Sequence, residues 1–545
     1  MKTQILLTMK IRSISTFLAF GTTLLFGGYL CFSSVSSAAK PGSDGPKDQG
    51  LQFPREDGSA AAGKAVFRFE TFGNEGFWTL AVRIPAGVKA AKVTPYQAMK
   101  LGLSVDVDAI GSEMRSNLLA ELKADPTGKR SSFLNDPASM GKLINSNAII
   151  GMPAIDTNGD GTVNIDAGDQ VGTSCALCHT ITDGSMFKMK DGGSIGQRLD
   201  GLTNHNLNLG RILATAANSR ALFPLLQLEL KANKGKTIGR APKGLTENST
   251  EAEVDAYLSN PTYYPVGMFD DSFDGNGNPI HIAAFFRQDL AAPYGSEGSI
   301  AKLDHFSNMI YTIQFDLTNL TTSGGRALLN QLAGAAGDEV ADSYVKVLTA
   351  TGVSGYPFVK AKAFGKPGSA EAPIGLQVDQ QKLIDLNGYL ASLPAPTGIQ
   401  VSNNASLHGR ELFRTAGCTD CHNTDQGKKV PSFIVPMKKI FPGDDPKILG
   451  KRAAPLNDLM DTRNQIFDDK MIVTNASMRG SIRGIAMPLL LDLARKPSFL
   501  HDDSVSSLNS LLDPKRGASS PHPFYLAKPK DRDDVVQFLS GLHIQ

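Results

Sequence analysis

The chain has 545 residues, of which 41% are hydrophobic and 20% are charged, and its formal net charge is +2. This length favours two or more domains, and this composition excludes a polytopic membrane protein, a coiled coil and a largely disordered chain. The small net charge excludes a nucleic-acid binder that relies on a basic surface, so we expect no nucleic-acid partner.

The N-terminus has the pattern of an export signal. Basic residues precede an apolar run over residues 14–32, and small residues follow as far as Ala39, which suits cleavage by a signal peptidase. We therefore expect residues 1–39 to be a signal peptide and the rest of the chain to be exported to the periplasm. The alternative is an uncut anchor, because the apolar run is almost long enough to span a bilayer. With the signal removed, we expect no membrane span.

Residues 40–150 form an N-terminal region whose fold the pattern leaves open. The loop after it offers oxygen ligands at alternating positions, with Gly161 in sixth place, as EF-hand-like calcium loops do. The candidate calcium ligands are Asp156, Asn158, Asp160 and Asn164. Ala167 stands where such a loop needs a bidentate carboxylate, so a plain β-hairpin turned by Asn-Gly or Asp-Gly is the alternative.

Every cysteine beyond the signal belongs to a C-x-x-C-H motif, the attachment signature of c-type haem. The two motifs are Cys175, Cys178 and His179, and Cys418, Cys421 and His422. On one helical turn the two thiols share a face, so both can bond the haem vinyl groups while the adjacent histidine binds the iron. A thioredoxin-like pair would not need the histidines, and a shared zinc would join motifs that start 243 residues apart. We therefore predict two covalently attached c-type haems.

A similar amphipathic helix is predicted far downstream of each motif. Residues 382–393 and 533–542 share an apolar stripe, which is typical of a helix that packs one face on a core. The matching positions are Leu386, Tyr389 and Leu390 in the first helix and Val535, Phe538 and Leu539 in the second. The segments that lead into the motifs also look alike, with residues 168–171 corresponding to residues 409–412.

These repeats predict a mainly α protein with two cytochrome c-like helical haem domains and an N-terminal region of uncertain structure. The first haem domain covers residues 151–393 and carries a large insertion, because its motif and closing helix are much farther apart than those of the second. A Pro-rich linker covers residues 394–400, and the second haem domain covers residues 401–545.

The whole pattern resembles the bacterial dihaem cytochrome c peroxidase superfamily, which includes the dihaem enzyme that matures methylamine dehydrogenase; dihaem rubber oxygenases look like distant relatives. The strongest local match is residues 499–508, where the family carries an aromatic-x-His-Asp/Asn-Gly-Ser stretch and this chain has Asp503 in place of the Gly. Residues 292–299 are a weaker match to the family's Phe-Trp-Asp-Gly-Arg stretch, and they lack both the Trp and the Arg. As a plan, the resemblance covers residues 165–545.

The resemblance implies that a residue after the 501–504 stretch supplies the sixth ligand of the second haem, usually as Met or Tyr. Residues 504–525 hold no Met, so His522 is our candidate, with Met478 and Met487 as competitors. His205 is the best candidate for the distal ligand of the first haem, with Met186 and Met189 as competitors. Each of these residues also has a plain structural interpretation as a loop residue or a core filler.

Two functions fit this pattern. The first is an exported dihaem cytochrome that transfers electrons through both haems and can deliver them to an open first haem. The alternative is a dihaem peroxidase- or oxygenase-like enzyme that reduces peroxide or activates oxygen, with Glu297 as its distal acid. A six-coordinate iron carries electrons, whereas a five-coordinate iron can bind peroxide or oxygen. Either function implies a redox partner protein, such as a small cytochrome or a copper protein.

Overall fold

The computed structural model describes residues 58–542 except 236–240, 271–272, 276, 278, 289–290, 292–293, 295–299, 301, 370, 421, 423–433, 437–483, 487, 501–502, 504, 518–521 and 523. The predicted signal peptide, Glu297, Cys421, Met478 and Met487 therefore lie outside the described residues. Within the described residues, no helix has the length and the apolar composition that crossing a bilayer requires.

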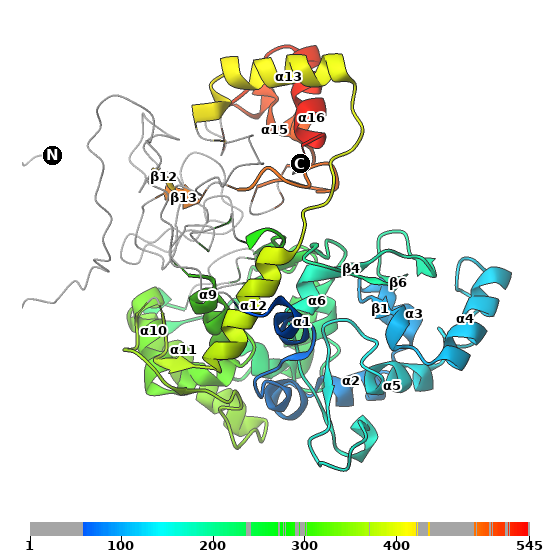
Figure 1. The fold of residues 1–545 in the computed structure, drawn as a ribbon. Coiled ribbons are helices and arrows are strands. Elements are labelled where there is room, and N and C mark those ends of the chain that lie inside the picture. The colour runs from blue at the N-terminus through cyan, green and yellow to red at the C-terminus, as the bar shows by residue number, and fades with distance from the viewer. Residues whose placement is uncertain are drawn as a thin grey trace, which may run out of the picture. The chain divides into compact units, whose positions relative to one another are not determined.

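Helices dominate the described part of the chain, as predicted for a mainly α protein (Figure 1). The α-helices are α1 (Ala60–Phe69), α2 (Ile84–Ala90), α3 (Pro95–Lys100), α4 (Ser112–Ala124), α5 (Pro137–Asn145), α6 (Ala176–His179), α7 (Leu209–Leu213), α8 (Glu251–Ser259), α9 (Leu303–Met309), α10 (Ser323–Ala333), α11 (Ala335–Ala350), α12 (Gln380–Ser392), α13 (Asn403–Thr415), α15 (Leu508–Leu511) and α16 (Pro529–Ser540).

The strands are short, and they pair into small separate sheets. They are β1 (Val105–Asp106), β2 (Ala154–Ile155), β3 (Gln170–Val171), β4 (Thr180–Thr182), β5 (Phe187–Lys188), β6 (Ser194–Gly196), β7 (Arg198–Asp200), β8 (Met268–Phe269), β9 (Ile280–His281), β10 (Lys362–Ala363), β11 (Leu376–Gln377), β12 (Ile434–Pro436) and β13 (Gly484–Ala486). β1 runs parallel to β6 in the sheet β1-β6-β5, while β2-β3, β4-β7, β8-β9, β10-β11 and β12-β13 are antiparallel.

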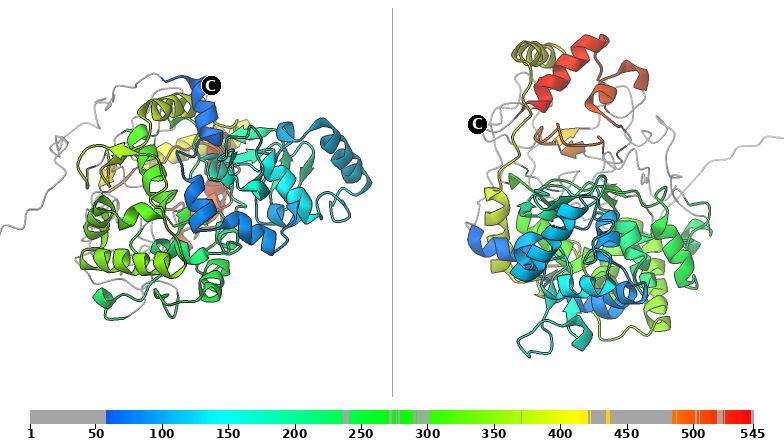
Figure 2. Two further views of the ribbon diagram at one scale, coloured as in Figure 1. Left: turned by 90° about the horizontal axis from the view of Figure 1, so that it is seen from below. Right: turned by 90° about the vertical axis from the view of Figure 1, so that its right-hand side faces the viewer.

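Two helix pairs share one construction. α1 packs against α12, and α13 packs against α16, as the ribbon views show (Figures 1 and 2). A glycine permits each close contact: a Cβ on Gly63 would lie 1.9 Å from the carbonyl oxygen of Asp385, and one on Gly409 would lie 2.0 Å from that of Asp534. Because no side chain fits at either crossing, the two backbones can approach closely.

Aromatic side chains repeat the same correspondence. The rings of Phe67 and Tyr389 have centroids 5.7 Å apart, and those of Phe413 and Phe538 also have centroids 5.7 Å apart. Offset aromatic pairs at such a distance are favourable beyond the apolar area that they bury. Each helix pair is therefore fastened by a glycine contact and an aromatic contact at equivalent positions.

The predicted match between residues 168–171 and residues 409–412 is wrong. Gln170–Val171 is strand β3 rather than a helix, and it pairs with β2. The helical counterpart of residues 409–414 is residues 63–68, which carry Gly, Phe and Arg at the same offsets. Residues 168–171 were matched to residues 409–412 because both have small and charged side chains and lie shortly before a motif. The segment that packs on α12 is instead α1, which is much farther from the motif in sequence.

The closing helices agree with the prediction. Asp379 caps the start of α12 by accepting a hydrogen bond from the backbone N–H of Lys382. The predicted stripe residues Leu386, Tyr389 and Leu390 of α12 and Val535, Phe538 and Leu539 of α16 are all buried. Burying these stripes supplies the main stabilisation of each helix pair.

The buried apolar residues form three clusters within the described part of the chain. The largest runs from Phe77 to Ile374, so the expected boundary after residue 150 does not coincide with a break in packing. The second gathers residues of α1, α6 and α12 around Cys175, and the third gathers residues of α13 and α16, with Cys418 packed against it. Each C-x-x-C-H motif therefore lies against the cluster that its own helix pair closes.

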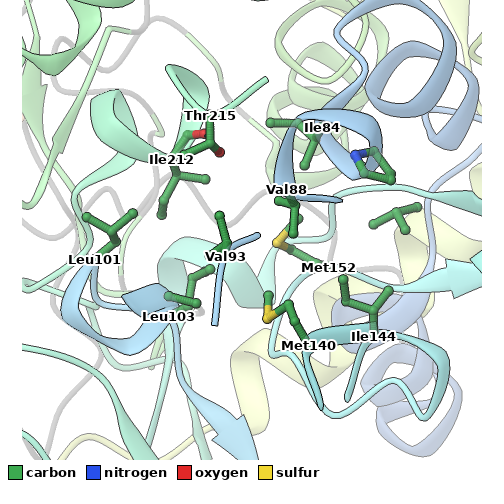
Figure 3. A pocket seen from close by; sticks show the side chains of 13 residues that line it. Ile84, Val88, Val93, Leu101, Leu103, Met140, Ile144, Met152, Ile212 and Thr215 are labelled. Carbon is green, nitrogen blue, oxygen red and sulfur yellow. The ribbon is translucent and has the colours of Figure 1, made fainter. Parts of the chain in front are cut away.

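A small cavity lies within the largest cluster (Figure 3). Its lining residues are Ile84, Pro85, Val88, Val93, Ala98, Leu101, Leu103, Met140, Ile144, Met152, Val171, Ile212 and Thr215. In this lining only Thr215 has a polar side chain, so the cavity offers packing space rather than groups for acid–base or ligand chemistry.

Candidate functional site

Both motifs form a helical turn, as their spacing predicts. The backbone N–H of His179 donates to the carbonyl of Cys175 over 3.2 Å, and that of His422 donates to the carbonyl of Cys418 over 2.9 Å. Among the described residues, Cys175, Cys178 and Cys418 form no disulfide. Burial raises the pKa of Cys175 to about 11 and that of Cys178 to about 12, so both thiols of the first motif are protonated at neutral pH.

The imidazole of His179 is held in one orientation and one tautomer. Its Nδ1 lies 2.8 Å from the carbonyl oxygen of Ala283, and because a carbonyl only accepts, Nδ1 carries the proton and Nε2 keeps its lone pair. The ring of Phe285 stacks on the imidazole with centroids 3.6 Å apart and an 8° tilt, and so covers one face of it. Burial lowers the pKa of His179 to about 4, so the ring is neutral and able to bind a metal.

A buried carboxylate fixes the strand that follows His179. Asp200 accepts hydrogen bonds from Arg68 over 2.6 Å, from Thr180 over 3.0 Å and from Tyr389 over 2.6 Å. Its side chain is 2% exposed. Arg68 lies on α1, Tyr389 on α12 and Thr180 on β4. Asp200 therefore connects both helices of the α1–α12 pair to the strand that follows the first motif.

Tyr311 lies against the first cysteine of the motif. Its hydroxyl is 3.4 Å from the Sγ of Cys175, and its ring meets Phe72 and Phe315 edge-on with centroids 4.5 Å and 5.3 Å away. Burial raises the pKa of Tyr311 well above its ordinary value, so the hydroxyl keeps its proton. The residue belongs to a π-helical turn, Ile310–Gln314, a feature that often marks functional sites.

At the second motif, the structure brings His422 and His522 together. Their ring centroids are 6.2 Å apart, with 47° between the planes. In the described part of the chain, neither Nδ1 has a hydrogen-bond partner, and both atoms are shut off from solvent. Burial lowers the pKa of both rings, that of His522 to about 4. His522 also has a φ of 55°, a strained backbone that typically persists where a residue must be aimed at a site.

His205 lies beside the first motif but not against its imidazole. The preceding residue, Asn204, donates its backbone N–H to the carbonyl of Cys178 over 2.9 Å. Burial and, to a smaller extent, the charge of Lys496 together lower the pKa of His205 to about 4. Between the two described histidines His205 and His179, no hydrogen bond or ring contact is present, so the predicted distal role of His205 stays a prediction.

The acidic loop is the tip of the β2-β3 hairpin. Asp156 accepts hydrogen bonds from the backbone N–H groups of Gly159 and Gly161, and Asp160 accepts from Thr162. Among the residues that the structure describes, no group of three or more His, Cys, Asp or Glu side chains gathers as a metal site. β2 and β3 pair at the base of this loop, but residues 156–169 connect them, which is longer than an Asn-Gly or Asp-Gly turn, and calcium binding stays an untested prediction.

Several residues that shape the first site were not predicted from the sequence. They are Asp200, Ala283, Phe285 and Tyr311. Ala283 contributes a backbone carbonyl, for which no side-chain pattern exists, and Tyr311 is 136 residues away from its cysteine. In the sequence, only the aromatic residues near position 285 indicated that this segment belongs to the site.

No family model matches the chain, and no curated protein matches it. A solved structure of hydrazine synthase from Kuenenia stuttgartiensis is similar over 50% of this chain and 76% of its own chain, with 13% sequence identity and a TM-score of 0.24. A TM-score this low supports no statement about fold or function, so the interpretation depends on the chain's own residues.

Proposed function

We propose that the protein is an exported dihaem c-type cytochrome that transfers electrons through two covalently attached haems. One observation carries the proposal: both C-x-x-C-H turns present a neutral, partly buried imidazole, and the second of them faces another imidazole. Every cysteine beyond the predicted signal is committed to these two motifs.

The residues of the first motif fit such a group. Cys175 packs in the cluster closed by α1 and α12, and Cys178 packs against the largest cluster, so an apolar macrocycle bonded to both thiols has apolar surroundings. His179 offers a free Nε2, because Ala283 holds its Nδ1. Metal-binding histidines usually donate their other ring N–H to a carbonyl or carboxylate in this way. Such a hydrogen bond fixes the orientation of the ring and raises its basicity.

At the second motif the described residues His422 and His522 also fit. A metal–imidazole bond is about 2 Å long, so two imidazoles that held one metal ion between them would have to lie close together. The rings of His422 and His522 are 6.2 Å apart. Burial lowers the pKa of both rings, so each is neutral and offers a lone pair that a metal could take. We infer that His422 and His522 would be the two protein ligands that hold the haem iron at this motif.

Each bound haem would supply a one-electron couple at its iron. The chain's own residues set the conditions for that couple. His179, His422 and His522 stay neutral because burial lowers their pKa values. Ala283 and Phe285 orient the first imidazole, and Asp200 holds the strand that follows it.

The proposed location and partner follow from the sequence. A chain that enters the periplasm can receive haem at C-x-x-C-H motifs and exchange electrons there with a small cytochrome or a copper protein. The predicted signal over residues 1–39 supports this location.

A haem assay and electron paramagnetic resonance test the proposal. A pyridine haemochrome assay of the exported protein should give two haems per chain, and the double variant Cys175→Ser, Cys178→Ser should give one. Two low-spin ferric signals that do not respond to peroxide would support electron transfer. A high-spin signal that changes with peroxide would instead support the peroxidase- or oxygenase-like alternative, and a colourless protein would refute both.

A further inference from the structure

The apolar cavity of the largest cluster lies where helices α2, α3, α5 and α7 meet (Figure 3). A water-sized sphere can move its centre through about 20 Å³ of this cavity. One water molecule needs roughly 10–15 Å³ by this measure, so the cavity has room for a guest of one or two heavy atoms. Among the described residues that line it, none belongs to a C-x-x-C-H motif.

The lining favours an apolar guest over water. Among the described lining residues, Thr215 alone has a polar side chain, and its hydroxyl donates a hydrogen bond to the carbonyl of Ile212 over 2.6 Å. A buried water molecule typically makes about three hydrogen bonds to polar groups. A water molecule in this cavity would therefore lose most of its hydrogen bonds, whereas an apolar molecule has none to lose.

Backbone contacts hold the walls of the cavity in place. Asn208 donates its backbone N–H to the carbonyl of Leu101 over 2.8 Å, which joins the start of α7 to the end of α3. α2 also meets the chain that follows α7 at close range, because a Cβ on Gly87 would lie 1.8 Å from the carbonyl oxygen of Thr215. Since the backbones are fastened on both sides, the walls relax only partly toward each other and the cavity persists.

The cavity has a buried floor and a rim nearer to solvent. Met140 and Met152 of the floor are buried, whereas Val88 and Val93 of the rim are half-buried. Partly exposed side chains change rotamer quickly, so the rim can admit a small molecule. The two methionines are flexible and carry polarisable sulfur atoms, which adapt to the shape of a guest and strengthen its dispersion contacts.

We propose that this cavity binds a single small, uncharged and apolar molecule, a dissolved gas of the size of xenon or dioxygen. Removing the guest and the lining from water supplies the binding free energy. A charged or strongly polar molecule of the same size is rejected, because the lining cannot replace its hydration. This inference does not depend on the proposed function, since it requires no bound haem.

Methyl NMR with xenon as the probe tests the proposal. The protein is labelled with carbon-13 at its methionine methyl groups and exposed to increasing xenon pressure. We expect the signals of Met140 and Met152 to shift and then to level off, as for a single site that fills. Met268 is the internal control, because it is also buried, at 1% exposure, but does not belong to the lining.

Variants that fill the cavity test where the xenon binds. Ala98 lines the cavity from α3, so Ala98→Leu should abolish the response of both methionines to xenon. Ala120→Leu is the matched control, because it makes the same change at an exposed position of α4 and should leave the response intact. Val93→Leu enlarges the rim by one methylene group and should weaken the response, which keeps the test decisive if Ala98→Leu fails to fold.

Three results would overturn the inference. Shifts at Met140 and Met152 that never level off, or that equal the shift at Met268, would show that xenon has no site here. A full response in both Ala98→Leu and Val93→Leu would place the xenon elsewhere. Magnetisation transfer from a long-lived water molecule to either methionine methyl group would show that the cavity is hydrated. Because none of these readouts involves haem, such a failure leaves the proposed function untouched.

Discussion

The imidazole rings of His422 and His522 face each other with centroids 6.2 Å apart, although the two residues are 100 positions apart in the chain. His422 belongs to the second motif, and His522 stands between two prolines in the sequence and has a left-handed backbone, with a φ of 55°. That backbone conformation costs free energy and is typical of residues held at a functional site.

We predict that His522→Ala will convert one of two low-spin ferric signals to high-spin while leaving the haem content at two per chain. The reason is that alanine cannot bind iron, whereas the attachment residues are untouched. Electron paramagnetic resonance measures the change. His408→Ala is the matched control, since His408 is a half-exposed histidine of α13 that pairs with Asp534. Two intact low-spin signals in His522→Ala would contradict axial ligation by His522.

The glycine contacts of the two helix pairs give a second prediction. Gly63→Ala and Gly409→Ala each place a Cβ within about 2 Å of a backbone oxygen of the partner helix, so the helices must separate. We expect each change to lower the free energy of unfolding by at least about 1–3 kcal/mol. Gly141→Ala in α5 is the control, because nothing lies within 4 Å of the added Cβ.

Chemical denaturation measures both effects. Gly141→Ala should stabilise the protein by about 0.5–1 kcal/mol, since alanine favours a helix interior over glycine. If Gly63→Ala and Gly409→Ala behaved like Gly141→Ala, the tight helix crossings would be refuted.

Asp200 gives a third prediction. Asp200→Asn removes the charge that Arg68 pairs with over 2.6 Å in a site where the Asp200 side chain is 2% exposed. We expect a loss of about 3 kcal/mol, as for other broken buried pairs. Asp166→Asn is the control, because Asp166 and Lys89 are also 2.6 Å apart but are 61% and 77% exposed. That change should lower the free energy of unfolding by less than about 1 kcal/mol. Equal losses in the two variants would show that the Asp200–Arg68 pair contributes no more to stability than an exposed pair.

The sequence predicted correctly those features of the fold that depend on the spacing of residues within one helix. The helical turns of both motifs and the buried stripes of α12 and α16 follow from periods of three and four residues, which a single helix dictates. His522 could be named because the segment that the family resemblance implicates holds few metal-binding side chains. The mainly helical composition followed from the same local patterns.

The remaining features depend on contacts between distant residues, which local patterns do not encode. α1 is the partner of α12, yet more than 300 residues separate Gly63 from Asp385, so residues 168–171 near the motif were wrongly chosen instead. The support of His179 by Ala283 is a backbone contact, and any residue type that keeps the same backbone path at position 283 could provide it. The contact between Lys496 and His281 likewise joins residues 215 positions apart.

Tyr311 gives a fourth prediction. Tyr311→Phe removes the hydroxyl that lies 3.4 Å from the Sγ of Cys175 and should shift the absorption spectrum or the midpoint potential of the first haem only. Tyr344→Phe is the matched control, because Tyr344 is also fully buried and donates to the carbonyl of Ala221 over 2.8 Å. Each change should cost about 1–3 kcal/mol of stability. A haem spectrum that is unchanged in both variants would show that Tyr311 serves packing alone.

The fifth prediction concerns pH and the contact between α13 and α16. Asp534 accepts hydrogen bonds from Lys530 over 2.5 Å and from His408 over 2.7 Å, and these two groups hold the pKa of Asp534 below its ordinary value of 3.8. A carboxyl group with a lowered pKa stabilises the folded state above its unfolded pKa, and this contribution is lost as the pH falls through the folded pKa. Asp534→Asn should therefore lower stability near neutral pH.

The size of that loss should shrink as the pH falls below 3.8, because the wild-type carboxylate becomes protonated and loses its charged partners. Denaturation midpoints of the wild type and Asp534→Asn, compared at a series of pH values, measure the difference. Asp533→Asn is the control, because Asp533 is an exposed neighbour on the same helix and its amide can still accept the hydrogen bond from Asn509. A stability difference for Asp534→Asn that stayed constant from neutral to acid pH would show that the side chain acts through its shape and not through its charge.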